Sequence, residues 1–444
     1  MPRPGPNLAL FSVVAAVLTL GCSRPDLGER AAPALDLDDD PRAFVTSAAY
    51  RRGVLERDLV DPEPIYARAR LRRYSKDSPR GWDGLPIRDW ASAPLTQADA
   101  AFIERERQLP EVELGPTLGS SYGTEDAPEL PTNEAEWIAL GERVFFEFPM
   151  SIAPWIGRAL REGSDLRDYG ILVHDEAYVG VRLTELEGKR RVAVTCAICH
   201  ASLDAEGQPS GVRANRHYDL GALRLAHGGA RATQLVDATS AEDLGELGPG
   251  RSDVQRDKAF NPYAFPDFGG IADKPYLHHT ANWHNRGTAT LAIRIETVFM
   301  GGSRENRNRP PRVLMWALAT YLRSLPPPPP VAAPSEQSRR GEQVFAREGC
   351  DTCHSPPLYT SDTRVPLDEL GTDDAAGTSP IRGTGHWRVP SLRGVGGNAP
   401  YLHHGALATL DALFDPKRSE PGHQFGLELD ADERADLLAF LRTI

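Results

Sequence analysis

Two copies of the pattern Cys-x-x-Cys-His are the residues of this 444-residue chain whose types and spacing point most directly to chemistry. Two thiols one helical turn apart can add across the two vinyl groups of a haem, and the imidazole that follows reaches the iron from the same side. The pattern therefore predicts two covalently attached c-type haems. The predicted attachment and iron-binding residues are Cys196, Cys199, His200, Cys350, Cys353 and His354.

The fifth cysteine, Cys22, is the only one outside the two motifs. An exported protein usually uses its cysteines in disulfide bonds, and none is left here for such a bond beyond the motifs. A zinc site would need further short-spaced Cys or His pairs, and a thioredoxin-like centre would need a βαβ setting. Neither context is present in the sequence, so the haem interpretation is preferred.

The N-terminus has the features of an export signal. Arg3 precedes the apolar run Leu8–Leu20, which is too short to span a membrane but suits the core of a signal peptide. We expect residues 1–21 to be that signal peptide. The sequence LTLGC resembles a bacterial lipobox, in which Cys22 is lipidated, although Thr19 departs from the usual pattern. The alternative is ordinary secretion with an incidental Cys22, and both place the chain on the periplasmic or cell-surface side of a bacterial membrane.

Three landmarks occur twice, in the same order, around the two motifs. This order predicts a duplicated domain. The landmarks are Gly-Glu-x-Val-Phe (141–145 and 341–345), Pro-Tyr-Leu-His-His (275–279 and 400–404) and a closing amphipathic helix (312–325 and 433–444).

The predicted fold is mainly α, with two class I cytochrome c-like domains in tandem, the first enlarged by insertions, behind a loop-rich N-terminal extension. Alternating apolar residues over 169–196 predict strands in the first domain, and residues 95–109 predict one short helix in the extension. The Pro-rich segment cannot be helical and is expected to be extended. The expected boundaries are 1–21 for the signal peptide, 22–135 for the lipid-anchor tether and extension, 136–325 for the first domain with haem 1, 326–334 for the Pro-rich linker and 335–444 for the second domain with haem 2.

The sixth iron ligand decides whether a haem only carries electrons or also binds a small molecule. No methionine follows Met315, so the second haem cannot have the usual His/Met pair from its own domain. His423 lies shortly before the last helix, where class I cytochromes place this ligand, and we expect it to bind the second iron. His403 and His404 are alternatives, and an ordinary loop histidine is the other interpretation of His423.

For the first haem, Met300 is the internal candidate for the sixth ligand. It follows the Pro-Tyr-Leu-His-His landmark at nearly the same distance as His423 does in the second domain, in an expected loop ahead of the closing helix. The alternative is that Met300 only fills the core, which leaves the first haem open to a small ligand.

An open first haem would need a neighbouring group that handles protons. His278, His279 and Glu296 are the candidates for this catalytic role. The structural alternative for the two histidines is that Tyr-Leu fills the haem crevice while a histidine caps a turn. Trp283 and Trp387 lie in the loops expected to cover the haems, where an aromatic ring would assist electron transfer.

The net charge of -12 argues against a nucleic-acid binder, which needs a basic face. No GxxxxGK phosphate-binding loop is present in the sequence. An acidic protein favours a basic redox partner, such as a small basic cytochrome or a cupredoxin.

Residues 387–416, WRVPSLRGVGGNAPYLHHGALATLDALFDP, resemble the second-domain signature of the bacterial dihaem cytochrome c peroxidase and methylamine-utilisation maturation group. The Pro-Ser-Leu-Arg stretch (390–393) and the Ala-Pro-Tyr-x-His-x-Gly turn (399–405) follow the second haem motif, as in that group. Residues 421–444 further resemble the C-terminus of the dihaem rubber oxygenases. The resemblance implies that one haem relays electrons while the other binds peroxide or oxygen, and it suggests a Ca²⁺ ion between the domains.

Two functions from different classes follow from these observations. The first is an exported cytochrome that transfers electrons through two six-coordinate haems. The alternative is a peroxidase- or oxygenase-like enzyme that reduces or activates peroxide or oxygen at haem 1, with haem 2 as its electron relay.

Overall fold

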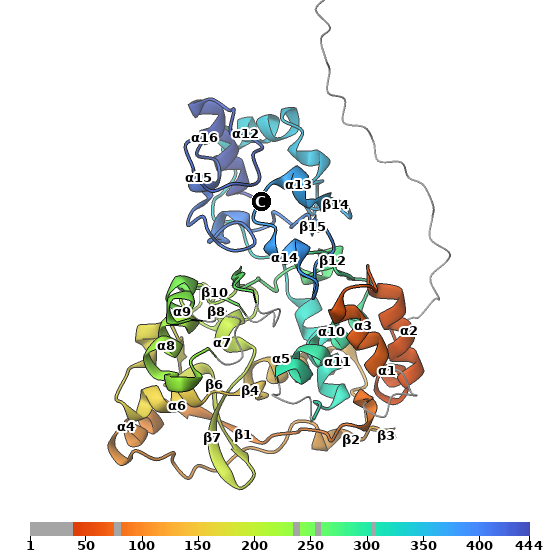
Figure 1. The fold of residues 1–444 in the computed structure, drawn as a ribbon, viewed down its shortest axis with the longest axis vertical. Helices are drawn as coiled ribbons and strands as arrows, with labels where there is room; N and C mark the ends of the chain where they lie inside the picture. Colours follow the sequence, from red (N-terminus) through yellow and green to blue (C-terminus); the bar gives the residue numbers. More distant parts are fainter. Residues whose placement is uncertain (1–38, 75–80, 234–239, 254–258, 303–307) are drawn as a thin grey trace, which may run out of the picture. The chain divides into compact units, whose positions relative to one another are not determined.

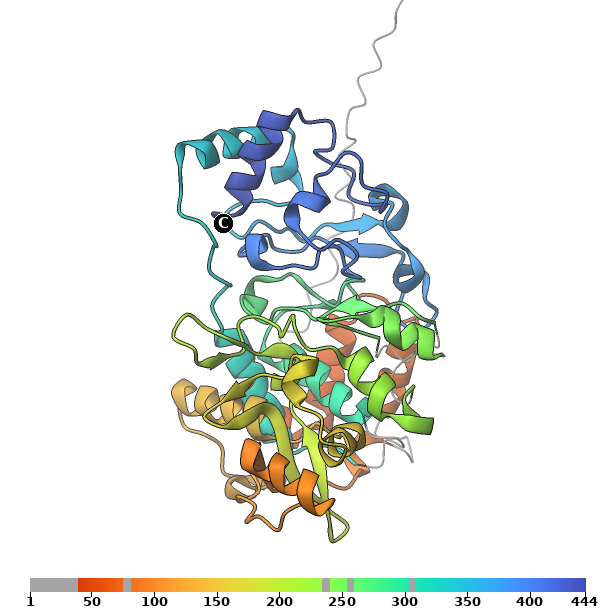
Figure 2. The same cartoon turned by 90° about the vertical axis from the view of Figure 1, so that its left-hand side faces the viewer.

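Helices make up most of the regular structure in the computed structural model, and small antiparallel sheets lie among them (Figures 1 and 2). The predicted signal peptide, residues 1–21, and Cys22 lie outside the described residues. Within the described segments, none of the helices combines the length and the apolar character needed to span a bilayer. The structure describes residues 39–74, 81–233, 240–253, 259–302 and 308–444.

Two helix pairs of the same design flank the two haem motifs (Figure 1). Helix α5 (Glu134–Glu147) packs on α11 (Arg312–Ser324), and α12 (Glu336–Arg347) packs on α16 (Ala431–Leu441). Each pair joins the helix before a Cys-x-x-Cys-His motif to a helix well after it. The closing helices predicted over 312–325 and 433–444 are therefore present as α11 and α16. We call residues 136–325 the first half and residues 335–444 the second half.

Side chains at the starts of these helices satisfy backbone N–H groups that have no partner within a helix. Asn133 caps α5, Ser335 caps α12 and Asp430 caps α16, each by accepting a hydrogen bond from the N–H three residues further on. The helix boundaries therefore follow from local sequence.

The repeated glycines allow the two helix pairs to pack closely. A Cβ atom on Gly141 would lie well inside van der Waals contact with the carbonyl oxygen of Ala317. A Cβ atom on Gly341 would meet the carbonyl oxygen of Asp436 in the same way. The glycine of the Gly-Glu-x-Val-Phe landmark is thus a packing residue in both halves.

The phenylalanine of this landmark has matching contacts in the two halves. The ring centroid of Phe145 lies 5.5 Å from that of Tyr321 on α11. The ring centroid of Phe345 lies 5.3 Å from that of Phe440 on α16. All four rings are buried, so each pair is closed by an aromatic contact next to its glycine.

A five-stranded antiparallel sheet leads into the first motif. Its central hairpin pairs β6 with β7, and Val181, Leu183, Val192 and Val194 on it are buried. The strands predicted over 169–196 are therefore confirmed. The strand order is β1-β6-β7-β4 with β5 also on β6, and the strands are β1 (Ser92–Thr96), β4 (Ser151–Ile152), β5 (Val173–His174), β6 (Ala177–Leu186) and β7 (Lys189–Val194).

The N-terminal extension is more helical than the sequence predicted. The predicted helix over 95–109 is present as α4 (Gln97–Glu106), but α1 (Pro41–Thr46), α2 (Ala48–Asp58) and α3 (Ile65–Arg73) were not predicted. The loop-rich prediction was wrong for these segments. Their many Arg and Pro residues obscure a few apolar side chains that become buried only against the first half.

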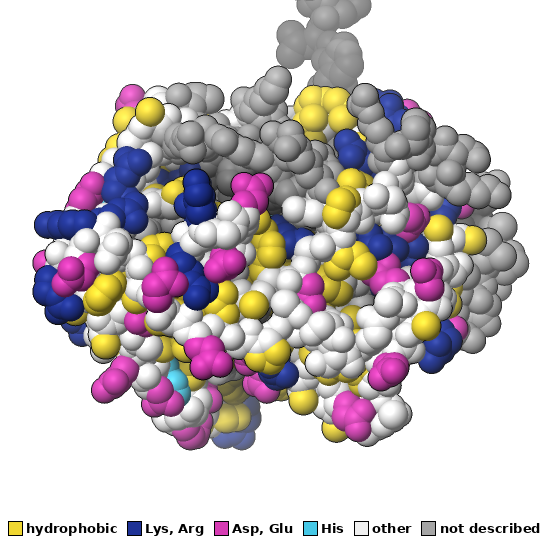
Figure 3. All heavy atoms as spheres, turned by 90° about the horizontal axis from the view of Figure 1, so that it is seen from below, with side chains coloured by type: hydrophobic (Ala, Val, Ile, Leu, Met, Phe, Trp, Pro, Cys, Tyr) yellow, Lys and Arg dark blue, Asp and Glu magenta, His cyan; other side chains and the backbone are white. Residues whose placement is uncertain are grey.

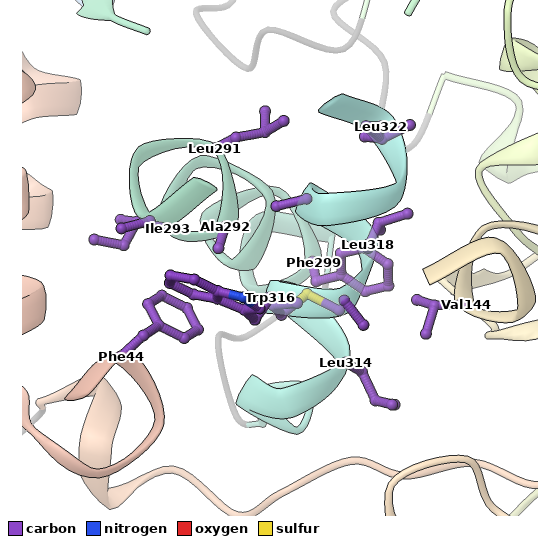
Figure 4. Packing of buried hydrophobic residues seen from close by; sticks show 14 of the residues in the cluster. Phe44, Val144, Leu291, Ala292, Ile293, Phe299, Leu314, Trp316, Leu318 and Leu322 are labelled. Atoms are coloured by element: carbon purple, nitrogen blue, oxygen red, sulfur yellow. The ribbon is translucent and has the colours of Figure 1, made fainter. Parts of the chain in front are cut away.

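These N-terminal helices share one hydrophobic core with the first half. The ring of Phe44 on α1 lies 5.4 Å from that of Trp316 on α11, measured between centroids. Figure 4 shows Trp316 between Phe44 and side chains of α10 (Thr288–Gly302), with Val144 of α5 on the other side. Phe44 and Val144 are fully buried, so the extension is part of the fold of the first half.

The Pro-rich segment 326–334 contains neither helix nor strand, as predicted for an extended spacer. It is also hydrogen bonded to both halves. The N–H groups of Val331 and Ala332 each donate to the carbonyl oxygen of Arg442 at 3.0 Å, and the carbonyl oxygen of Pro329 accepts a hydrogen bond of 2.8 Å from Arg213. Hydrogen bonds of Pro329, Val331 and Ala332 therefore hold the segment against both halves.

Short elements complete the described structure. In the first half and before it they are η1 (Trp82–Gly84), η2 (Ser120–Tyr122), β2 (Gly123–Thr124), β3 (Ala127–Pro128), α6 (Pro154–Arg161), η3 (Leu166–Tyr169), α7 (Ala197–His200), β8 (Ser202–Leu203), β9 (Pro209–Ser210), α8 (Leu220–His227), η4 (Gly229–Arg231), α9 (Ala241–Leu247), β10 (Arg251–Ser252), β11 (Tyr263–Ala264), η5 (Ile271–Asp273), β12 (Tyr276–Leu277) and β13 (Trp283–His284). In the second half they are η6 (Cys350–Thr352), β14 (Arg364–Pro366), α13 (Leu367–Leu370), α14 (Ala375–Thr378), β15 (His386–Arg388), η7 (Val395–Gly397) and α15 (Leu410–Leu413).

Candidate functional site

The first motif forms a single helical turn after β7. The N–H of His200 donates to the carbonyl oxygen of Cys196 at 3.1 Å, which closes the turn. Cys196 and Cys199 are not joined in a disulfide bond. Burial raises the pKa of each thiol to about 12, so both stay protonated rather than becoming metal-binding thiolates.

The second motif has the same turn. The N–H of His354 donates to the carbonyl oxygen of Cys350 at 2.9 Å, and Cys350 and Cys353 are free thiols. Burial raises the pKa of Cys350 to about 11. Both motifs therefore present two thiols and an imidazole from one turn of backbone, the arrangement that haem attachment needs.

A proline carbonyl orients each motif histidine. Nδ1 of His200 lies 3.1 Å from the carbonyl oxygen of Pro266, and Nδ1 of His354 lies 3.1 Å from that of Pro390. A carbonyl oxygen can only accept, so Nδ1 carries the proton and Nε2 keeps its lone pair. Burial lowers the pKa of His200 to about 4 and also lowers that of His354, so both rings are neutral at neutral pH.

His423 faces His354 across a cavity of about 340 Å³ that is also lined by Cys350 and Cys353. The centroids of the two imidazole rings are 6.5 Å apart. Two imidazoles that bind one metal ion through nitrogens about 2 Å away on opposite sides would have centroids roughly 6 Å apart. The residues present therefore fit a haem iron held between His354 and His423. We call this space the His423 cavity.

The backbone of His423 holds its ring in place. The residue has a left-handed backbone conformation, with φ +47°, and its N–H donates to the carbonyl oxygen of Leu370 at 3.0 Å. Burial lowers the pKa of His423 to about 4 and so favours the neutral ring that can bind a metal ion. Iron ligation by His423 stays a prediction.

The two alternative ligands have other contacts. The rings of His403 and His404 stack on each other at 4.5 Å, and His403 lies over Trp387 at 4.4 Å, both measured between centroids. Nε2 of His404 donates to the carboxylate of Glu420 at 2.9 Å. His403 lines the His423 cavity, but the ring that faces His354 is that of His423.

Met300 lies inside helix α10 rather than in the predicted loop. The helix extends from Thr288 to Gly302, so the expectation of a loop at this position was wrong. The apolar residues of this helix continue the core far enough to keep Met300 helical and fully buried. Cys196 and Phe268, whose ring lies 4.4 Å from that of His200, pack in or against the same core. Met300 is thus placed in the core around the first motif, and its role as a ligand stays a prediction.

His278 and His279 lie where the two halves meet. The ring of His279 stacks on Tyr263 at 5.1 Å between centroids, and its carbonyl oxygen accepts a hydrogen bond of 2.9 Å from the N–H of Arg388. Nδ1 of His278 lies 2.9 Å from Oγ1 of Thr280. Burial, together with neighbouring cations, lowers the pKa of both histidines well below the ordinary value.

Glu296, the third catalytic candidate, has its described contacts elsewhere. It is fully buried and pairs with Arg312 at 3.1 Å, and Tyr74 donates a hydrogen bond to it. Burial and the neighbouring carboxylate raise the pKa of Tyr74. The structure therefore brings His279 into the His423 cavity and places Glu296 in a buried ion-pair network.

An aromatic cluster joins the two halves beside the His423 cavity. Tyr263 of the first half lies 5.7 Å from His403 of the second, and His279 lies 6.3 Å from His403, both between ring centroids. Trp387 completes the cluster, whereas Trp283 is fully buried in the core of the first half. Sequence reasoning missed Tyr263, because no repeated landmark contains it.

Three cavity residues were also missed by sequence reasoning. Arg216, Lys274 and Arg388 line the His423 cavity, and the sequence analysis assigned no role to any of them. For the predicted Ca²⁺ ion, the described residues contain no group of three or more His, Cys, Asp or Glu side chains arranged to hold a metal ion. The Ca²⁺ ion stays an expectation from the resemblance.

No family model matches the chain. It is 31% identical over 120 residues to the methylamine utilization protein MauG of Methylorubrum extorquens, a match that covers 24% of this chain and 34% of that protein. It is 30% identical over 119 residues to the cytochrome c peroxidase Ccp of Escherichia coli, covering 24% of this chain and 25% of that protein. The chain thus spans about a third or less of the length of these relatives.

A solved structure described as a MauG-like protein associated with microbial copper homeostasis is also similar. It has 19% identity and a TM-score of 0.34, and the match covers 70% of this chain and 89% of that one. At this score the likeness carries no weight for function.

Proposed function

We propose that the chain is a member of the superfamily of dihaem cytochrome c peroxidases and MauG proteins, and that it is an exported c-type cytochrome that transfers electrons through two covalently attached haems. Its local similarity to MauG and to the peroxidase Ccp supports this proposal. The observation that carries this proposal is the matched construction of the two motifs. Each has two free thiols and a histidine whose Nδ1 is bound to a proline carbonyl. When bound, a haem supplies one-electron chemistry at its iron.

The residues around the motifs have separate tasks in this proposal. The four motif cysteines hold the cofactors, and His200 and His354 present Nε2 to the iron. Pro266 and Pro390 fix the tautomer of these histidines, as second-layer hydrogen bonds do at many metal sites. His423 completes the second site from the other side of its cavity.

The aromatic cluster supports electron passage between the halves. Tyr263 and His279 of the first half lie against His403 of the second, and no ring centroid in these contacts is more than 6.3 Å from the next. Trp387 extends the cluster along the wall of the His423 cavity. Closely packed aromatic rings shorten the distance that an electron must cross outside the haems.

A second candidate function is peroxide reduction at the first haem, with the second haem as relay. The observation that favours it is an asymmetry between the two sites. In the described part of the chain, the ring of His200 contacts the rings of Phe265 and Phe268. The ring of His354 instead faces the imidazole of His423. If Met300 only fills the core, a haem held by His200 would have a position free for peroxide, and two electrons and two protons would convert one peroxide molecule into two of water.

We further propose that the protein lies on the periplasmic or cell-surface face of a bacterial membrane, held by lipid on Cys22, with a basic cytochrome or cupredoxin as partner. The net charge of -12 supports a basic partner. On the face in Figure 3, the basic and acidic side chains of the described residues are interspersed.

The test is an EPR and visible spectrum of the purified holoprotein, fully oxidised and half-reduced, with and without hydrogen peroxide. Electron transfer alone predicts two low-spin haems per chain that do not react with peroxide in either state. A high-spin haem that reacts with peroxide supports the enzyme instead. A haem content below two per chain, measured after conversion to the pyridine complex, contradicts both functions.

A further inference from the structure

The His423 cavity is not built by the second half alone. Cys350, His354 and His423 of the second half line it, and so do Arg216 and Lys274 of the first half. Arg388, on β15, lines the same cavity and binds the first half through the hydrogen bond from its N–H to His279. The cavity therefore extends from the second haem motif to a group of cations where the halves meet.

Positive charge exceeds negative charge in this group. Asp267 is the buried carboxylate among the lining residues, and it pairs with Arg216 at 2.7 Å. Lys274 donates from Nζ to the backbone carbonyl oxygen of Asp267 at 2.9 Å, not to a carboxylate. Nε of Arg388 is buried without a hydrogen-bond partner among the described residues. Three cations thus face one carboxylate.

The other lining carboxylates do not balance these cations. Glu348 pairs with Arg347 at 2.8 Å outside the cavity, and Glu369 is exposed to solvent. Burial lowers the pKa of Lys274 to about 7 and that of Arg388 to about 10, which is the direction expected for cations short of anionic partners. A buried ligand with two negative charges would relieve this imbalance.

We infer that Arg388, Lys274 and Arg216 bind the two propionate carboxylates of the second haem, so that the first half completes the cofactor site of the second. The inference rests on the proposed function, because it requires a haem on the second motif. Two propionates match the excess of cations over Asp267, and a guanidinium such as that of Arg388 binds carboxylates through paired hydrogen bonds. Haem 2 is therefore a cofactor shared between the halves.

The arrangement affects the reduction potential of haem 2. A cation beside the propionates favours the reduced haem, which carries one more negative charge than the oxidised form. Replacement of Arg388 by glutamine therefore lowers the potential. We expect the ratio of reduced to oxidised haem at a fixed applied potential to fall about tenfold, which corresponds to about 59 mV for a one-electron couple.

The experiment is a spectroelectrochemical titration of full-length holoprotein carrying Arg388→Gln, Arg388→Lys or Lys274→Gln. We expect Arg388→Gln and Lys274→Gln to lower one of the two midpoint potentials and leave the other unchanged. Arg388→Lys keeps the charge and should restore most of the potential, which a purely structural role would not predict. Arg339→Gln removes the same charge at an exposed position of α12 that does not line the cavity, and it should change neither potential.

The number of haems per chain distinguishes failure of the proposed function from failure of the propionate assignment. If wild-type protein holds fewer than two haems, the proposed function fails. If both haems are attached and neither potential responds to Arg388→Gln or Lys274→Gln, the function stands and the propionate assignment is wrong. A variant that loses one haem altogether, while Arg388→Lys keeps it, supports the assignment through cofactor retention.

Discussion

At the scale of single residues, the second motif depends on how two imidazole rings are held. His354 is bound to the carbonyl oxygen of Pro390 through Nδ1, and His423 is held by its left-handed backbone and its bond to Leu370. The rings then face each other at 6.5 Å between centroids. His404, the alternative ligand, donates a hydrogen bond to Glu420 instead.

We predict that His423→Ala converts one haem of the oxidised holoprotein from low-spin to high-spin, because the second iron loses its sixth ligand. EPR spectroscopy of the purified variant measures this change, and the low-spin signal of that haem should disappear almost completely. His404→Ala is the matched control and should leave both haems low-spin. Two low-spin haems in His423→Ala would contradict the assignment and would make His403 the next candidate.

At the scale of elements, each half is closed by a helix pair that packs through a glycine. Gly141 lies against α11 and Gly341 against α16, and in both places a Cβ atom would meet a backbone carbonyl oxygen. Backbone cannot move aside as a flexible side chain can, so these two positions accept only glycine without a shift of the helices.

We predict that Gly341→Ala destabilises the protein by about 1–3 kcal/mol, because the added methyl group forces α12 away from α16. Thermal unfolding followed by circular dichroism measures the change. Gly245→Ala is the control, since a Cβ atom at this position in α9 has no neighbour within 4 Å. That substitution should raise the free energy of unfolding by about 0.5–1 kcal/mol, as alanine is favoured over glycine inside a helix. Equal effects of both substitutions would contradict the close-packing argument.

At the scale of the whole molecule, buried ion pairs tie the N-terminal segments to the first half. Asp83 binds Arg51 of α2 and Arg312 of α11 at 2.5 and 2.6 Å. Glu125 binds Arg309 through two hydrogen bonds of 2.6 Å each. Because these arginines are almost fully buried, the charges depend on each other for their stability.

We predict that Glu125→Gln lowers the free energy of unfolding by about 3 kcal/mol, because it leaves the buried Arg309 without a counter-charge. Urea unfolding monitored by far-ultraviolet circular dichroism measures this loss. The control is Glu63→Gln, which breaks an exposed pair with Arg68 that spans 3.4 Å. Its cost should stay below about 1 kcal/mol. A small effect of Glu125→Gln would show that water replaces the carboxylate without penalty.

The same pairs predict a loss of stability in acid. Burial alone would raise the pKa of Glu125, but its hydrogen bonds with Arg309 and the charge of Arg312 outweigh burial and hold the pKa below its ordinary value of 4.5. A carboxyl group whose pKa is lowered by folding stabilises the protein above its ordinary pKa, and this contribution is lost as the pH falls through the folded pKa.

We therefore expect the free energy of unfolding to fall as the pH drops below 4.5, and to fall less steeply in Glu125→Gln. Urea unfolding at a series of pH values measures the two slopes. Equal slopes for wild type and variant would assign the acid sensitivity to other groups.

Much of the element pattern was predictable because it depends on local sequence. Helices α11 and α16 follow the spacing of apolar residues, and the strands of 169–196 follow their alternation. The N-terminal helices were missed because they are stabilised by contacts that a local pattern does not contain. Met300 was predicted in a loop and lies in helix α10, because its apolar neighbours pack into the core of the first half. The tandem domain arrangement and the iron ligands stay predictions.

The sequence by itself determined the positions of the two Cys-x-x-Cys-His motifs and the local similarity to MauG and cytochrome c peroxidase, because both depend on residues close together in the chain. A Cys-x-x-Cys-His turn needs only a few residues of backbone to present its thiols and imidazole on one side. Only the tertiary structure decided that His423 rather than His404 faces His354, and that Lys274 and Arg388 share one cavity. These side chains come from distant segments, and packing of the two halves, not spacing along the chain, brings them together.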